Sequence, residues 1–121
     1  MIAYMGLIFV VSSRSSLPSD VQAMNDKLLH GAEYGALSFL LVWAATQGRL
    51  RPVSGATVAM ATVVSTVYGL SDEIHQWLVP PRAFELRDLL ADATGAFVAA
   101  GSVWVWGIIS RGPRPETWRD G

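Results

Sequence analysis

The sequence lacks cysteine altogether, which excludes disulfides, thiolate metal ligands and cysteine nucleophiles. Charge is also scarce, because 16% of the 121 residues are charged while 51% are hydrophobic, a balance too apolar for an ordinary soluble domain. The formal net charge of −1 gives no basic field of the kind that binds nucleic acid, so we expect no nucleic-acid partner. What remains is a membrane protein whose chemistry would use histidine, carboxylates, lysine or arginine.

Four apolar runs divide the chain, and each is a candidate membrane crossing. Met1–Ser13 is shorter than the roughly 20 residues that span a bilayer, so we expect a first spanning helix that is short and tilted or incomplete. The other runs are Leu28–Gln47, Val53–Leu70 and Leu89–Ser110, and we expect the third helix to continue to Gln76. The sequence therefore predicts a single domain, residues 1–121, with about four transmembrane helices.

The segments between the runs carry residues that end or begin helices. Arg14–Asn25 mixes serine, proline, aspartate and asparagine, which predicts a loop. Asp26 is placed to cap the second helix, and Pro80–Pro81 should end the third, because proline lacks an amide donor. In hydrocarbon, backbone amides must be satisfied within a helix or a closed barrel, and these runs lack the alternation of barrel strands. The predicted fold class is therefore all-α, a polytopic membrane helical bundle.

The positions of lysine and arginine predict the orientation of this bundle. One side of the membrane would carry Arg49, Arg51, Arg111, Arg114 and Arg119, and the other Arg14, Lys27, Arg82 and Arg87. Because the side richer in these residues faces the cytoplasm, both termini are predicted to be cytoplasmic. Eight of the ten acidic residues then lie on the outward side.

Alternating crossings would bring three helix ends to the outward face, namely the start of the second helix, the end of the third and the start of the fourth. Residues three and four apart share one face of a helix, so polar side chains at these spacings project together. The residues that we expect to converge there are Lys27, His30 and Glu33 of the second helix, Asp72, Glu73, His75 and Gln76 of the third, Arg82 of the loop, and Asp88 and Asp92 of the fourth. Ionisable groups inside membranes are costly and tend to be functional, so this pocket is the candidate site.

The same three segments resemble the VanZ-like family. Asp26–Tyr34 (DKLLHGAEY), Tyr68–Gln76 (YGLSDEIHQ) and Asp88–Ala96 (DLLADATGA), with Arg82 before the last, resemble that family's motifs in order and spacing. The resemblance covers roughly Phe9–Ala100, and the three motifs together are more specific than each alone. It implies a bacterial cytoplasmic-membrane protein, associated in the family's namesake with low-level resistance to the glycopeptide teicoplanin.

The carboxylates of the predicted pocket outnumber the cations available to neutralise them. Lys27, Arg82 and Arg87 cannot balance all the acidic side chains, which are those of Glu33, Asp72, Glu73, Asp88 and Asp92. Leaving a carboxylate unpaired at low dielectric costs several kcal/mol, so surplus ones should be protonated, hydrated or bound to a cation. A divalent metal such as zinc is therefore one candidate cofactor, since imidazole and carboxylate ligands suit it.

Three other functions fit the same residues. The first is metal-free hydrolysis or transfer on a lipid-linked headgroup, with His75 or His30 as general base and Arg82 binding phosphate. The catalytic set would be His75, Asp72, Glu73, Asp92 and His30, and the substrate-binding set Arg82, Gln76, Asp88, Lys27 and Glu33. The second is capture of a membrane lipid, a lipid-linked envelope precursor or a glycopeptide. The third is a structural network that only fixes helix packing.

Overall fold

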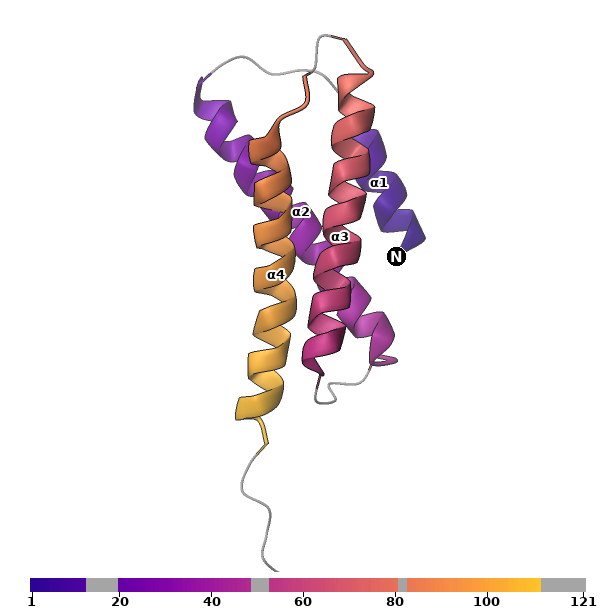
Figure 1. Cartoon of the computed structure of the whole chain (residues 1–121), viewed down its shortest axis with the longest axis vertical. Coiled ribbons are helices and arrows are strands. Elements are labelled where there is room, and N and C mark those ends of the chain that lie inside the picture. The colour runs from indigo at the N-terminus through magenta and orange to yellow at the C-terminus, as the bar shows by residue number, and fades with distance from the viewer. Residues whose placement is uncertain (13–19, 49–52, 81–82, 112–121) are drawn as a thin grey trace, which may run out of the picture.

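The protein is described by a computed structural model that covers residues 1–12, 20–48, 53–80 and 83–111 (Figure 1). These residues form four helices: α1 (Ile2–Ser12), α2 (Asp20–Ala45), α3 (Gly55–Trp77) and α4 (Leu86–Ile109). No strand occurs in the described ranges. The predicted all-α fold class is confirmed.

The start of α2 differs from the prediction. The loop predicted for Arg14–Asn25 is wrong over its last six residues, because Asp20–Asn25 are already helical. Alanine, methionine and glutamine in this stretch are good helix formers, and they outweigh the loop-forming residues before them. Asp26 therefore lies inside α2 and does not cap it. Residues 13–19 of the predicted loop lie outside the described residues.

The other helix boundaries agree closely with the sequence. Ser54 caps α3 by accepting a hydrogen bond from the Thr57 amide at 3.1 Å, as expected of serine at this position. The predicted extension of this helix through Gln76 is confirmed, because α3 ends at Trp77. The last helix, predicted from Leu89, begins one turn earlier at Leu86.

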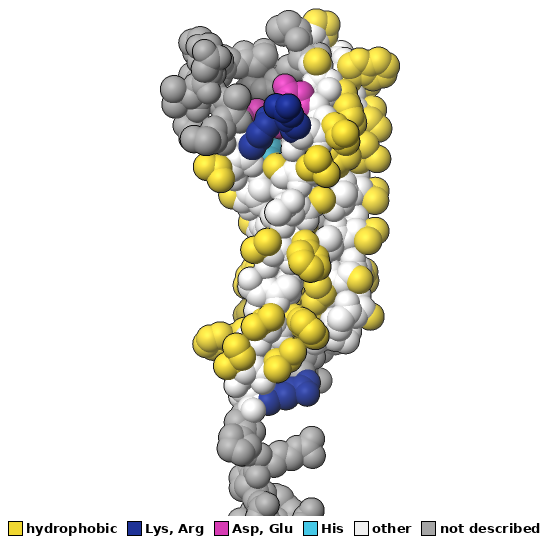
Figure 2. Space-filling view, turned by 60° about the vertical axis from the view of Figure 1, so that its left-hand side comes forward, with side chains coloured by type: hydrophobic (Ala, Val, Ile, Leu, Met, Phe, Trp, Pro, Cys, Tyr) yellow, Lys and Arg dark blue, Asp and Glu magenta, His cyan; other side chains and the backbone are white. Residues whose placement is uncertain are grey.

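Two of the helices are long and apolar enough to cross a membrane. They are the part of α2 from Asp26 to Ala45 and all of α4. The 23 residues of α3 give a comparable length of about 34 Å, whereas the 11 residues of α1 extend only about 16 Å. Large apolar side chains such as Val63, Phe97 and Ile108 are exposed on the outside of the bundle, and Figure 2 shows hydrophobic side chains along its length.

The closest helix contact is between α2 and α4, which run in the same direction while α3 runs opposite to both (Figure 1). A Cβ atom added to Gly95 would fall on the backbone of Gly31, 2.7 Å from its Cα. One added to Gly35 would lie 3.2 Å from the Gly95 carbonyl oxygen. The two backbones therefore touch at these glycines, as in other membrane helix pairs with small interface residues.

The short helix α1 packs against the half of the bundle that contains the starts of α2 and α4. The Tyr4 hydroxyl donates a hydrogen bond to the Glu33 carbonyl at 3.0 Å, and the Tyr68 hydroxyl donates to the Met5 carbonyl at 2.7 Å. Ile8 is buried among the residues of α2 and α3 at this end. Helix α1 thus covers one side of the region where the candidate site residues lie.

The glycine contact gives a prediction about stability. Gly95→Ala should lower the free energy of unfolding by about 1–3 kcal/mol, because the new methyl group overlaps the Gly31 backbone. Helix propensity alone would favour alanine by about 1 kcal/mol, so a loss identifies the steric contact. Thermal unfolding in detergent, followed by circular dichroism, measures the change.

Gly101→Ala is the matched control, since it is on the same helix and a Cβ there would meet nothing within 4 Å. This variant should be as stable as the unmodified protein or more so. Equal behaviour of the two variants would contradict the close helix contact.

Candidate functional site

The candidate site lies at the end of the bundle where α2 and α4 begin and α3 ends, the upper end in Figure 1. Figure 2 shows basic and acidic side chains together at this end, with a histidine just below them. Six of the residues expected from the sequence are buried here: His30, Asp72, Glu73, Gln76, Asp88 and Asp92. The three helix ends thus do meet, and their polar side chains point into the protein.

A histidine and an aspartate join α2 to α4 at the centre of this cluster. His30 Nδ1 lies 3.1 Å from Asp92 Oδ1, a distance at which an ionised Asp92 accepts a hydrogen bond from the histidine N–H. Asp92 is 0% exposed and His30 6% exposed. The pair therefore holds the imidazole ring in a fixed orientation with its other nitrogen, Nε2, left for a further interaction.

A lysine forms the second link between α2 and α4. The Lys27 ammonium lies 3.0 Å from Asp88 Oδ1 and 3.4 Å from Glu85 Oε2. Asp88 is buried, whereas the Glu85 side chain is 56% exposed and contributes less to the pairing. Lys27 thus neutralises the buried carboxylate at the first turn of α4.

Glu73 connects the end of α3 to the start of α4. Its Oε2 accepts a hydrogen bond from the backbone amide of Glu85 at 3.0 Å, whereas the side chain of Glu85, the N-cap residue, forms no capping bond. A carboxylate at a helix N-terminus also interacts favourably with the helix dipole. Glu73 therefore replaces the missing cap from a neighbouring helix.

Two buried carboxylate oxygens have no hydrogen-bond partner in the described part of the chain. They are Oε1 of Glu73 and Oδ2 of Asp92. The Asp92 oxygen lies against α3, where a Cβ added to Gly69 would be 2.6 Å from it. Gly69 thus makes the room that Asp92 occupies. Buried, unsatisfied carboxylate oxygens are costly, so this part of the site has unused capacity to bind a donor or a cation.

The remaining predicted residues lie around this centre. Gln76 donates a hydrogen bond to Asp72 at 2.9 Å, one turn apart on α3. The half-buried His75 stacks on Phe9 of α1, with ring centroids 4.1 Å apart. Glu33 is half-buried, and Arg82 lies outside the described residues. His30, rather than His75, is therefore the histidine that pairs with the buried Asp92.

Sequence reasoning missed Glu85 as a member of this cluster. Its backbone amide donates to Glu73, and its carboxylate accepts from Lys27. The signal that could have identified it is its position directly before Leu86, where the first apolar residues of α4 begin.

The fold and the site together define a class of protein. Two candidate membrane helices with a buried polar cluster where they begin indicate a helical membrane protein. Residues 2–107 match the family model described as VanZ/LLP1, so the chain belongs to this VanZ-like family. The resemblance of its three polar motifs to that family is confirmed. Comparison with curated proteins and with solved structures gave no match.

The ion pair between α2 and α4 can be tested by a double-mutant cycle. Lys27→Met should cost about 1–3 kcal/mol of stability, because it leaves the buried Asp88 carboxylate without its cation. The additional change Asp88→Asn should recover part of this loss, since the uncompensated charge is then gone. Thermal unfolding of both single variants and the double variant in detergent measures the coupling, with Lys27→Arg as the charge-retaining control. Strictly additive effects would show that the pair contributes nothing.

Proposed function

We propose that this protein acts at the outer face of the bacterial cytoplasmic membrane on a lipid-linked substrate of the cell envelope. The substrate's lipid tail would lie between α2 and α4, and its polar head would bind the cluster around His30 and Asp92. In this arrangement all four helices cross or enter the membrane with both termini on the cytoplasmic side. The excess of lysine and arginine on the side of the bundle that holds the termini supports this orientation.

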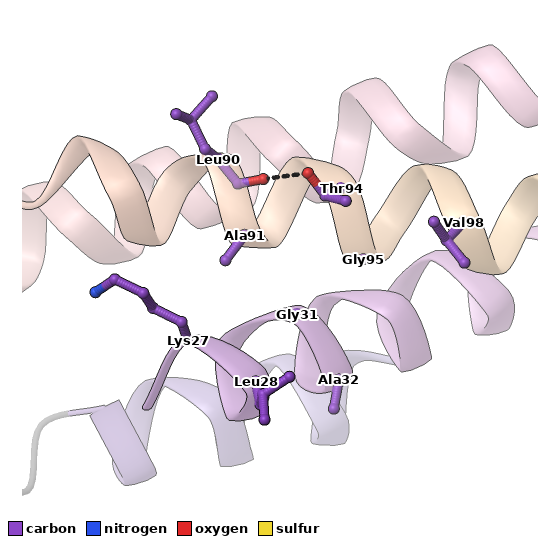
Figure 3. Close-up of a pocket in the computed structure, with 9 residues that line it drawn as sticks. All are labelled: Lys27, Leu28, Gly31, Ala32, Leu90, Ala91, Thr94, Gly95 and Val98. Carbon is purple, nitrogen blue, oxygen red and sulfur yellow. Dashed lines mark hydrogen bonds between the residues drawn. The ribbon is translucent and has the colours of Figure 1, made fainter. Parts of the chain in front are cut away.

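The observation that carries this proposal is an open groove between the two candidate membrane helices. The groove has a volume of about 570 Å³ and is mostly apolar (Figure 3). Its lining residues are Lys27, Leu28, Gly31 and Ala32 of α2 and Leu90, Ala91, Thr94, Gly95 and Val98 of α4. The Thr94 hydroxyl does not make the groove polar, because it donates to the Leu90 carbonyl of its own helix at 2.7 Å.

The charged end of this groove explains why a lipid with a polar head is the preferred occupant. Lys27 lies at one end of the lining and Val98 at the other (Figure 3). Lys27 pairs with Asp88, and this ion pair joins the groove to the polar cluster, since His30 and Asp92 lie one turn further along α2 and α4 without lining the groove themselves. A ligand with an apolar chain and a charged head therefore matches the groove along its whole length, and a uniformly apolar lipid does not.

Within this site the pair of His30 and Asp92 is the proposed reactive element. A histidine held by a carboxylate is an arrangement that serves both general bases and metal ligands. Glu73 and Asp72 would hold the polar head from the α3 side, together with Gln76. His75, which stacks on Phe9, would take part from the side of α1. Arg82, which lies between α3 and α4 in the sequence, would bind a phosphate.

The link to antibiotic resistance rests on family membership. The namesake of the VanZ-like family is associated with low-level teicoplanin resistance, and this chain matches the family over residues 2–107. Altering the amount or the headgroup of a lipid-linked envelope precursor would change what a glycopeptide meets at the cell surface. We therefore propose that expression of this protein lowers the susceptibility of a bacterium to teicoplanin.

The groove is tested by filling it. Ala32→Leu places a larger side chain in the lining at an exposed position, so the fold should be retained. In nanodiscs with a photoactivatable polyprenyl phosphate, labelling of this variant should fall about tenfold, equivalent to about 1.4 kcal/mol of binding. Ala59→Leu, at an exposed position on α3 outside the groove, should label like the unmodified protein. Equal labelling of both variants would rule the groove out as the lipid site.

The polar cluster is tested by removing one charge without changing size. Asp92→Asn should abolish the reduction in teicoplanin susceptibility while the protein still accumulates in the membrane and unfolds at a similar temperature. Ser102→Ala, at an exposed position further along α4, is the control and should retain full effect. The alternative, a network that only fixes helix packing, predicts instead that Asp92→Asn removes the folded protein itself. Susceptibility assays and quantification of folded protein in the same cells separate the two.

A further inference from the structure

Three side chains with metal-binding atoms meet near the start of α2 and α4. Asp26, His30 and Asp88 each offer one ligand atom, and these atoms all lie within 4.8 Å of one another. His30 and Asp88 are buried, and Asp26 is exposed. We propose that these three residues bind a divalent transition-metal ion, with Zn²⁺ as the best match.

The helical spacing of these residues suits a metal site. Asp26 and His30 are four residues apart, so they project from one face of α2. Asp88 approaches from α4, and Asp92, four residues later, also faces His30. Metal sites in helical bundles are commonly built in this way, from ligand pairs projected inward by facing helices.

The hydrogen bond between His30 and Asp92 supplies the second argument. A histidine that binds a metal through one nitrogen almost always donates its other ring N–H to a carboxylate, a carbonyl or water. His30 Nδ1 lies 3.1 Å from Asp92 Oδ1, and in the neutral tautomer that carries its proton on Nδ1 the lone pair of Nε2 would bind the metal. Asp92 would thus position the ligand without binding the ion.

The charge balance of the cluster supplies the third argument. In the described ranges, Lys27 forms ion pairs with Asp88 and Glu85, and His30 pairs with Asp92. The carboxylates at this end of α2, α3 and α4 include those of Asp26, Glu73, Glu85, Asp88 and Asp92. One oxygen each of Glu73 and Asp92 is buried without a partner. A dication bound by Asp26, His30 and Asp88 would add positive charge beside these buried carboxylates.

The proposed ligands also indicate which metal fits. One imidazole nitrogen and two carboxylate oxygens suit zinc better than magnesium or calcium, which prefer oxygen alone. Tetrahedral zinc with bonds of about 2.0–2.2 Å separates its ligands by about 3.4 Å. The exposed Asp26 can rotate to close the difference. Asp88 can bind Lys27 with one oxygen and the ion with the other.

Three protein ligands leave a fourth position open on zinc. A phosphate or water could occupy it, and only this last step rests on the proposed function. The metal site itself requires no lipid.

The test measures metal binding by the full-length protein in detergent. The metal-free protein, titrated with Zn²⁺, should bind one equivalent per chain, and its Tm should rise because the ion binds only the folded state. Co²⁺ in place of Zn²⁺ should give the absorption bands of a low-coordinate nitrogen and oxygen site. Asp26→Asn should weaken binding at least about tenfold and abolish the rise in Tm. Because Asp26 is exposed, this variant should fold normally.

Glu116→Gln is the matched control, since it also removes one carboxylate from the chain and is not among the three ligands. It should retain stoichiometric binding. Absence of binding to the unmodified protein, or equal binding by Asp26→Asn, would overturn the metal site. Lipid labelling measured on the same samples reports on the groove separately, so a failed metal site and a failed lipid function give different results.

Discussion

The contact between the backbones of α2 and α4 at Gly31 and Gly95 is the constraint on which the rest of the structure depends. Because the two helices run in the same direction, a contact at this level also brings together the residues in the turns just before each glycine. Side chains 62 positions apart in the chain, those of His30 and Asp92, then come within hydrogen-bonding distance. Lys27 and Asp88 meet one turn earlier for the same reason. Larger residues at the two glycines would separate both pairs at once.

Helix α3 contributes to the site through Gly69 and Glu73. Gly69 leaves room for the Asp92 carboxylate, and Glu73, one turn later, reaches the amide of Glu85 at the start of α4. A carboxylate so placed gains the favourable field of a helix N-terminus but loses its water. Within the part of the chain that the structure describes, one oxygen each of Glu73 and Asp92 is buried in this cluster without a partner.

Much of this arrangement could be predicted from residue spacing. The apolar runs gave the helices of the fold, and the polar motifs at their ends gave the helix faces that meet, because spacing alone places residues on one face. The start of α2 was not predicted because the serines and proline before Asp20 are typical of a loop. Glu85 was not predicted because its contacts depend on a neighbouring helix. Spacing also could not choose between His30 and His75, since that choice depends on how α3 is rotated about its axis.

The shortness of α1 has a consequence for how a ligand could travel. Its contacts reach Glu33, Tyr68 and His75, so it shields the polar cluster from the surrounding membrane on that flank alone. The opposite flank, between α2 and α4, is left open. Under the proposed function, a lipid would enter this groove from the side on which α2 and α4 meet. The lipid's tail would then contact the apolar lining, and its headgroup would lie at the end of the groove that carries Lys27.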